Sequence, residues 1–323
     1  FTLFLQQLIK AIEDDGILSP EKTRNITIGI AITPAPEKAQ FDINKLEPYV
    51  DEFHIMTYDF HGLFDSTKSG FHTNPYSIRE KKKSDYPSPS YSVEDSIKYF
   101  IGERGQVSDD KDNLGFINGD KGGYPIAPGP ITKLVPLPNI PINKLFIGTA
   151  FYSRGIKSKG PYTDGSNFTD TIDKELFPIW EFTNSDTPVD APGILPYSQI
   201  VEYANDSKNS WGNIMVDKDT KGAYILNTTK EYYLNFDNED SIKAKIDLIN
   251  NYKIGGMVIW ETQGDIRITI NNESSDPSSD PSSTKAPVNS LMKYISDNLN
   301  KTDNIVKKIN SNPSHSVSRF KSK

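Results

Sequence analysis

The chain has 323 residues, a net charge of -7 and no cysteine, so it is long enough for a large α/β domain and forms no disulfide bonds. Because nucleic-acid binding depends on clustered Lys and Arg, the acidic balance argues against a nucleic-acid partner. The four histidines lack metal-ligand spacing, and no stretch approaches the roughly 20 apolar residues of a membrane span. We therefore expect no metal, no cofactor, no nucleic acid and no membrane association.

The first part of the chain alternates between helix and strand patterns. Residues 1–16 have apolar side chains at helical spacing and a glycine at the end, which predicts a packed helix. Residues 25–34 form a β-branched run typical of a strand buried on both faces. A short helix over 43–52 and an apolar strand over 53–60 follow. This order indicates a parallel sheet with helices outside it.

The same alternation continues after a loop-rich stretch. Residues 92–103 predict a helix capped by Ser92, and the Pro- and Gly-rich residues 118–141 predict a loop. Residues 144–154 predict another buried strand. Residues 241–256 then predict a helix that stops at a glycine, and the strand of residues 257–261 follows it.

Residues 156–236 differ in character, with short aromatic strands and one helix, and predict a small α+β insertion. Residues 272–287 are a polar Ser/Asp/Pro repeat that predicts disorder. The expected organisation is a first barrel part (1–155), the insertion (156–236), a last helix and strand (237–271), the disordered loop (272–287), a final helix (288–300) and a polar tail (301–323).

Four motifs resemble glycoside hydrolase family 18, the chitinases and chitinase-like proteins. They are Met56–Asp59 (MTYD), Phe151–Arg154 (FYSR), Gly193–Tyr197 (GILPY) and the strand Gly255–Asp265. In order and spacing they look like strands 6, 7 and 8 of the family's barrel, with residues 25–34 as strand 5. The resemblance implies an α/β fold, a partial (β/α)8 TIM barrel of strands 5 to 8, with an α+β chitinase insertion domain between strands 7 and 8.

The resemblance also implies hydrolysis of β-1,4-linked N-acetylglucosamine polymers by a substrate-assisted retaining mechanism. Tyr58 would position the sugar's acetamido group, Asp59 would accept sugar hydroxyls, and Trp260 would form an aromatic floor. Taken singly such residues are more often core than site, but their joint occurrence at successive strand ends favours ligand contact. The implied substrate-binding residues are Met56, Tyr58, Asp59, Tyr152, Arg154 and Trp260.

One family motif is absent from the sequence. No D-x-x-D-x-D-x-E run is present, so the catalytic Glu is expected upstream of Phe1 and the chain as given is expected to be inactive. The resemblance then implies a missing N-terminal half-barrel as partner, chitin or chito-oligosaccharide as ligand, and an extracellular location. Two alternatives stay open, a non-catalytic chitin-binding lectin of the same fold and an inactive fragment. A Glu at the end of the strand-4 run would favour hydrolysis and a Gln, Leu or Ala would favour the lectin, whereas failure of the chain to fold alone would fit the fragment.

Overall fold

The computed structural model describes residues 1–14, 26–34, 42–62, 70–77, 91–102, 114–116, 134–136, 138–157, 193–205, 212–227, 232–266 and 290–299. The predicted disordered loop (272–287) and polar tail (301–323) lie outside the described residues.

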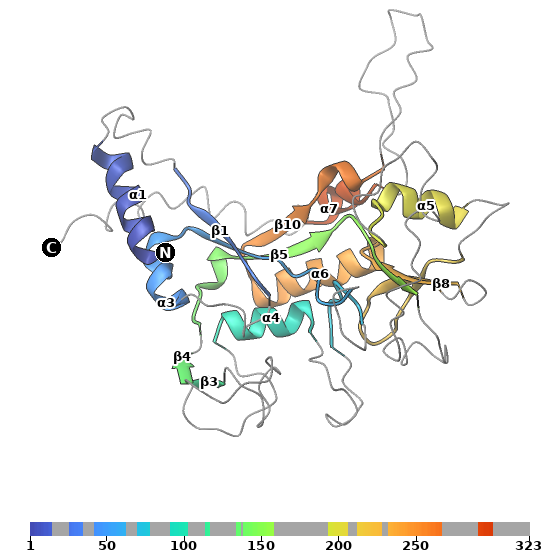
Figure 1. Ribbon diagram of the computed structural model, residues 1–323, viewed down its shortest axis with the longest axis horizontal. Coiled ribbons are helices and arrows are strands. Elements are labelled where there is room, and N and C mark those ends of the chain that lie inside the picture. The colour runs from blue at the N-terminus through green and yellow to red at the C-terminus, as the bar shows by residue number, and fades with distance from the viewer. Residues whose placement is uncertain are drawn as a thin grey trace, which may run out of the picture.

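Four parallel strands form the central sheet, in the order β1-β2-β5-β10. They alternate with helices along the chain, which confirms the predicted α/β class (Figure 1). The described strands form an open sheet that does not close into a barrel. The strand bounds are Gly29–Ile32 for β1, Glu52–Ile55 for β2, Leu145–Ala150 for β5 and Gly256–Trp260 for β10.

Helices α4 (Val93–Phe100) and α6 (Glu239–Tyr252) cover one face of this sheet (Figure 1). Their apolar side chains share one buried cluster with Phe53 and Ile55 of β2. The predicted cap of α4 is confirmed, because the Ser92 side chain accepts a hydrogen bond from the backbone N–H three residues on. Helix α6 has a capping box at its start, so both helices begin at positions that their side chains determine.

The structure differs from the sequence prediction at the end of α6 and in the predicted loop before β5. Helix α6 ends at Tyr252 and Lys253 takes the left-handed conformation, so the predicted stop at Gly255 is wrong by three residues. Residues 134–136 were expected as loop, yet β4 (Leu134–Pro136) pairs with β3 (Leu114–Phe116) in an antiparallel ladder. Proline is tolerated there because each strand of a two-stranded sheet is an edge strand.

Helix α1 (Thr2–Asp14) is less packed than its apolar pattern predicts. Leu5 is buried at 2% exposure, whereas Leu3 is 73% exposed and Phe4 is 57% exposed. Strand β1 is also more open than expected, because it lies at the edge of the sheet and only Ile32 among its four residues is buried. Helix α3 (Ile43–Leu46) and the short turn η2 (Glu47–Tyr49) connect this edge to β2.

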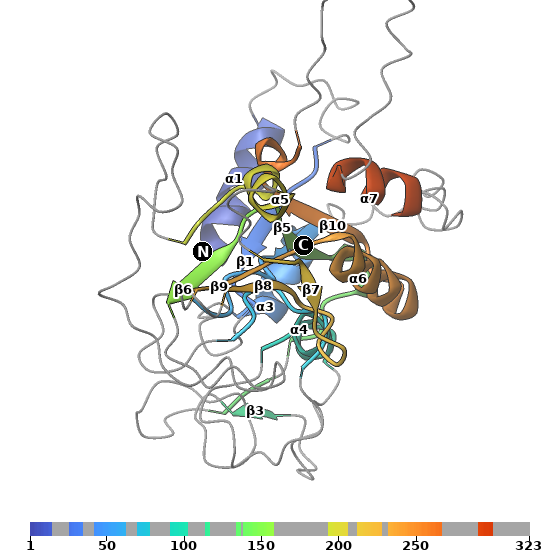
Figure 2. The same cartoon turned by 90° about the vertical axis from the view of Figure 1, so that its right-hand side faces the viewer.

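A second, antiparallel sheet follows the order β6-β9-β8-β7 and faces the viewer in Figure 2. Apolar residues of this sheet, of helices α5 and α7 and of α6 form a second buried cluster. The bounds are Arg154–Lys157 for β6, Tyr197–Asn205 for α5, Met215–Val216 for β7, Ala223–Asn227 for β8, Tyr232–Phe236 for β9 and Leu291–Leu299 for α7, with short turns η4 (Ile142–Lys144) and η6 (Thr262–Gly264) beside β5 and β10.

Candidate functional site

The candidate site lies where β2 and β5 end. Met56 extends the ladder one residue beyond β2, because its N–H donates to the Ile32 carbonyl at 2.9 Å. The backbone then turns, because the Tyr58 N–H donates to the Met56 carbonyl at 2.7 Å. Both residues line a single cavity of about 180 Å³. The structure thus places these two candidate residues on one cavity, just after the end of β2.

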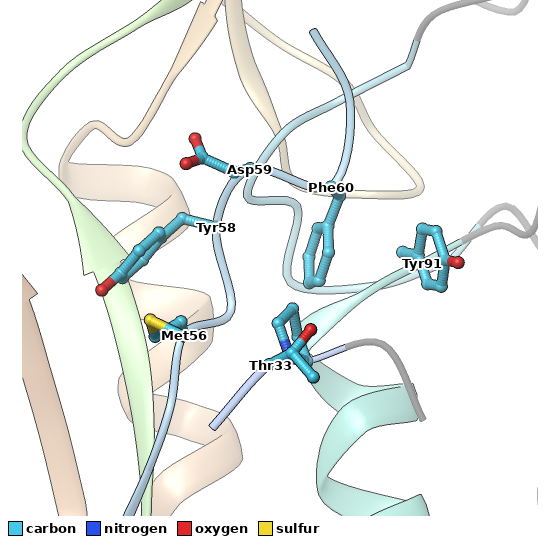
Figure 3. Close-up of a pocket in the computed structure, with 7 residues that line it drawn as sticks. Thr33, Met56, Tyr58, Asp59, Phe60 and Tyr91 are labelled. Carbon is cyan, nitrogen blue, oxygen red and sulfur yellow. The ribbon is translucent and has the colours of Figure 1, made fainter. Parts of the chain in front are cut away.

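Aromatic and polar side chains share the walls of this cavity (Figure 3). Phe60 and Tyr91 form its aromatic side, with stacked rings whose centroids are 5.8 Å apart and whose planes differ by 20°. Thr33, which follows β1, lies between Met56 and Tyr91 in Figure 3, and Pro34 also lines the cavity. The full lining is Thr33, Pro34, Met56, Tyr58, Asp59, Phe60 and Tyr91.

A glycine of β5 makes room for Tyr58. A Cβ atom built on Gly148 would lie 2.7 Å from Cε1 of the Tyr58 ring, well inside van der Waals contact. The edge of the Tyr58 ring also meets the Tyr152 ring, with centroids 6.2 Å apart. Gly148 is thus a residue of the site that the sequence reasoning missed. Its signal was a glycine inside a strand pattern, which often marks close approach of another group.

Asp59 links the two strand ends electrostatically. Its Oδ1 accepts one hydrogen bond from the Tyr152 hydroxyl at 2.6 Å and another from Arg154 Nε at 2.7 Å. The backbone of Asp59 has a φ of 59°, a region in which Asp and Asn are tolerated better than most residues. The structure therefore brings together Asp59, Tyr152 and Arg154, three of the implied substrate-binding residues, and places Arg154 at the start of β6.

The charges of the cluster are fixed by burial and by one another. Burial alone would raise the pKa of Asp59, but His72, Arg154 and Tyr152 outweigh it and hold this pKa well below its usual range. Burial and the Asp59 charge raise the pKa of Tyr58 to about 12. The pKa of Tyr152 is also raised far above its ordinary value, first by burial and then by Asp59. At neutral pH the site thus presents an ionised carboxylate and two protonated phenols.

His72 is a second residue that the sequence did not point to. It is completely buried, and its ring centroid lies 5.3 Å from that of Tyr152. The Asp59 N–H points at His72 Nδ1 across 3.4 Å. Burial lowers the pKa of His72, against the opposing effect of the Asp59 carboxylate. No local pattern assigns His72 a partner, because the groups bonded to it come from residues 13 and 163 positions away.

Trp260 lies on the neighbouring strand rather than in the cavity lining. It ends β10 opposite Ala150, and its side chain is 57% exposed. Its carbonyl accepts a hydrogen bond from the Phe151 N–H at 2.8 Å, which places it one residue from Tyr152 in the sheet. A broad aromatic side chain is thus exposed at the end of the strand next to β5.

The described part of the chain contains no group of three or more His, Cys, Asp or Glu side chains arranged to hold a metal ion. Among the same residues, no helix combines the length and the apolar character that crossing a membrane would require.

A cavity with polar and aromatic walls at the carboxyl ends of parallel strands is where α/β-barrel enzymes carry their active sites. Residues 1–265 match the family model described as glycosyl hydrolases family 18. The chain is 23% identical over 264 residues to the probable endochitinase of Orgyia pseudotsugata multicapsid polyhedrosis virus, covering 81% of this chain and 38% of the relative. The chain therefore belongs to family 18 of the glycosyl hydrolases.

Solved structures show the same fold. A chitinase from Bacillus thuringiensis superposes with a TM-score of 0.61 at 20% identity, over 93% of this chain and 39% of that one. A Group IV chitinase from Ostrinia furnacalis, solved in complex with allosamidin, gives a TM-score of 0.54 at 19% identity, over 82% of this chain and 56% of that one. The chain thus has the α/β fold of a TIM-barrel-like domain and spans less than two thirds of each of these relatives.

Proposed function

We propose that the cavity at the carboxyl ends of β1 and β2 binds an N-acetylglucosamine unit of chitin or a chito-oligosaccharide. The observation that carries this proposal is the Asp59 cluster, a carboxylate held by Tyr152 and Arg154 at the rim of a cavity with aromatic walls. Fixed polar groups beside aromatic faces suit a pyranose ring, whose C–H faces are apolar and whose edges carry hydroxyl groups.

Tyr58 and Asp59 have complementary roles in this proposal. Because its pKa is raised to about 12, Tyr58 keeps its hydroxyl hydrogen at neutral pH and donates it to the acetamido oxygen. Such a bond holds the acetamido group for attack on the anomeric carbon in a substrate-assisted, retaining mechanism. Both protein donors bond to Oδ1 of Asp59, and Oδ2 is the oxygen that we assign to a sugar hydroxyl. Trp260 supplies the exposed aromatic face next to this group.

The whole protein in this proposal is a secreted chitinase that hydrolyses β-1,4-linked N-acetylglucosamine polymers. Strands β1, β2, β5 and β10 then correspond to strands 5 to 8 of its barrel, and residues 156–236 to its insertion domain. The 323 residues contain no D-x-x-D-x-D-x-E run, so in this proposal they do not supply the catalytic Glu.

A chitin-binding lectin of the same fold is the second candidate, and one observation favours it. Asp59 is the only carboxylic acid among the described residues that line the cavity, and its pKa is lowered. A general acid needs a raised pKa, so this carboxyl group is suited to accept hydrogen bonds rather than to donate a proton. The described site can therefore bind the sugar without cleaving it.

Calorimetric titration of the chain with chitotriose and with cellotriose tests the proposal. The two sugars differ at the 2-position, where only chitotriose carries the acetamido group, so we expect chitotriose alone to bind. Tyr58→Phe should weaken binding about tenfold, the value of roughly one hydrogen bond. The matched control is Tyr49→Phe, whose hydroxyl lies at the other end of β2 and accepts from Gln6, and it should bind like the parent. Equal affinity for both sugars would contradict the proposal.

A further inference from the structure

Asp237 and Lys245 form a completely buried ion pair that the proposed binding site does not use directly. Lys245 Nζ lies 2.6 Å from Asp237 Oδ2, and both side chains have 0% exposure. Removing two charges from water costs free energy that an apolar pair of the same volume would not cost. A buried pair of this kind is therefore poorly explained by stability alone, and its contacts indicate what else it does.

Lys245 reaches from α6 to two segments that carry site residues. Its ammonium group donates to Thr73 Oγ1 at 2.6 Å and to the Gly148 carbonyl at 3.2 Å, besides Asp237. These three bonds use all three hydrogens of the ammonium group. Thr73 follows His72 directly in the chain. The Gly148 carbonyl also accepts from Thr57 Oγ1 at 2.9 Å, and Thr57 directly precedes Tyr58.

Asp237 holds the end of β5 in the same way. Its Oδ2 accepts from Thr149 Oγ1 at 2.7 Å and from the Ala150 N–H at 3.0 Å, two residues before Tyr152. Its Oδ1 accepts from Ser241 Oγ at 2.7 Å, which fixes the carboxylate to the first turn of α6. The ion pair thus connects α6 to three segments that carry site residues. It bonds to Thr149 and Ala150 before Tyr152, to Thr73 after His72, and to the Gly148 carbonyl, which also binds Thr57 before Tyr58.

Asn235 of β9, two residues before Asp237, makes a further link between segments that carry site residues. Its Oδ1 accepts from the His72 N–H at 2.5 Å, and its Nδ2 donates to the Arg154 carbonyl at 2.9 Å. Asn235 is 2% exposed and pairs with Arg154 in the sheet register. The backbones that carry His72 and Arg154 are therefore held to one amide group.

We infer that the Asp237–Lys245 pair and Asn235 are positioning residues for the candidate site. They act through Thr57, Thr73, Thr149 and Ala150 to fix the distances between Tyr58, Asp59, Tyr152 and Arg154. Directional bonds to a buried charge tolerate less displacement than apolar contacts, so the pair supplies geometry rather than stability. The ligand part of this inference rests on the proposed function, whereas the geometric part does not.

The test uses the full chain and the double variant Asp237→Asn/Lys245→Met, which removes both charges and changes the size of either side chain only slightly. The primary measurement is the NMR signal of the Arg154 Nε–H group, which is bonded to Asp59 in the parent. We expect this signal to move toward that of Asp59→Leu, in which the bond is broken. Chitotriose affinity should fall about tenfold, because a small misplacement of binding groups is costly.

Lys144→Met is the matched control. Lys144 is also a largely buried lysine in an ion pair, 2.6 Å from Glu47, but it lies at the amino end of β5, away from the site. Its loss should lower stability and leave the Arg154 signal and the chitotriose affinity unchanged. Thr73→Val, which removes one bond of Lys245 and keeps both charges, should shift the Arg154 signal in the same direction by a smaller amount.

An unchanged Arg154 signal in a folded double variant would overturn the inference, and so would an equal shift in Lys144→Met. If the double variant does not fold, Thr73→Val decides by the same criterion. Failure of the parent to bind chitotriose would contradict the proposed function alone, because the Arg154 signal reports the geometry without a ligand.

Discussion

Replacing Asp59 with Asn tests how strongly the carboxylate organises the site. Asn keeps the size of the side chain and tolerates the left-handed backbone at φ 59°, so only the charge is lost. The parent carboxylate accepts two bonds, at 2.6 Å and 2.7 Å, and bonds to a charged group contribute about 1.5–3 kcal/mol each, roughly twice the neutral value. Because the Asp59 side chain is 36% exposed, solvent screening reduces this difference. We expect the free energy of unfolding to fall by about 1–2 kcal/mol.

The pH dependence of this loss separates charge from packing. The pKa of Asp59 is lowered in the folded state, so its stabilising effect is complete above the unfolded value of about 3.9 and is lost as the pH falls toward the folded value. Urea unfolding of the parent and of Asp59→Asn should therefore differ most near pH 7 and progressively less below about pH 4. A difference that is absent at pH 7, or that is the same at both pH values, would refute the reasoning.

Three further expectations follow from the cavity and from helix α1. Gly148→Ala should displace the Tyr58 ring and weaken chitotriose binding about tenfold in calorimetry, and unchanged affinity would show that the ring has room to move. Because the pKa of Tyr58 is about 12 and that of Asp59 is low, chitotriose affinity should stay constant between about pH 7 and pH 9; a titration midpoint in that range would be inconsistent with this assignment. Leu5→Ala should lower the free energy of unfolding by about 2–4 kcal/mol, whereas Leu3→Ala, at a 73% exposed position, should change it by less than about 0.5 kcal/mol; equal losses in urea unfolding would contradict the described packing of α1.

Local patterns allowed most elements of the fold to be predicted. Helix α4 begins where Ser92 caps it, and β5 follows a continuous apolar run bounded by turn residues. Such elements depend on side chains within a few positions of one another, so a single sequence contains the signal. The exposed face of α1 was not predictable in this way, because an apolar helical pattern does not say whether the described chain provides a surface for it to pack on.

The site was predictable only in part, for a related reason. Tyr58, Asp59, Tyr152 and Arg154 were expected from motifs that resemble a known family. Their hydrogen bonds join positions more than 90 residues apart, and no local pattern reports such contacts. The same holds for His72 and for the Asp237–Lys245 pair, whose links to Thr73 and Gly148 span up to 172 residues. Burial of these groups becomes visible only when the sheets are assembled.

The most direct test of sugar binding at this site is NMR of the methionine methyl groups during titration of the full chain with chitotriose. The chain has four methionines, and Met56 lines the cavity, while Met292 lies on α7 with 38% exposure. We predict that the Met56 methyl signal shifts in a saturable manner with the sugar and that the Met292 signal does not. A Met56 signal that stays fixed while calorimetry detects chitotriose binding would place the sugar elsewhere and contradict the account.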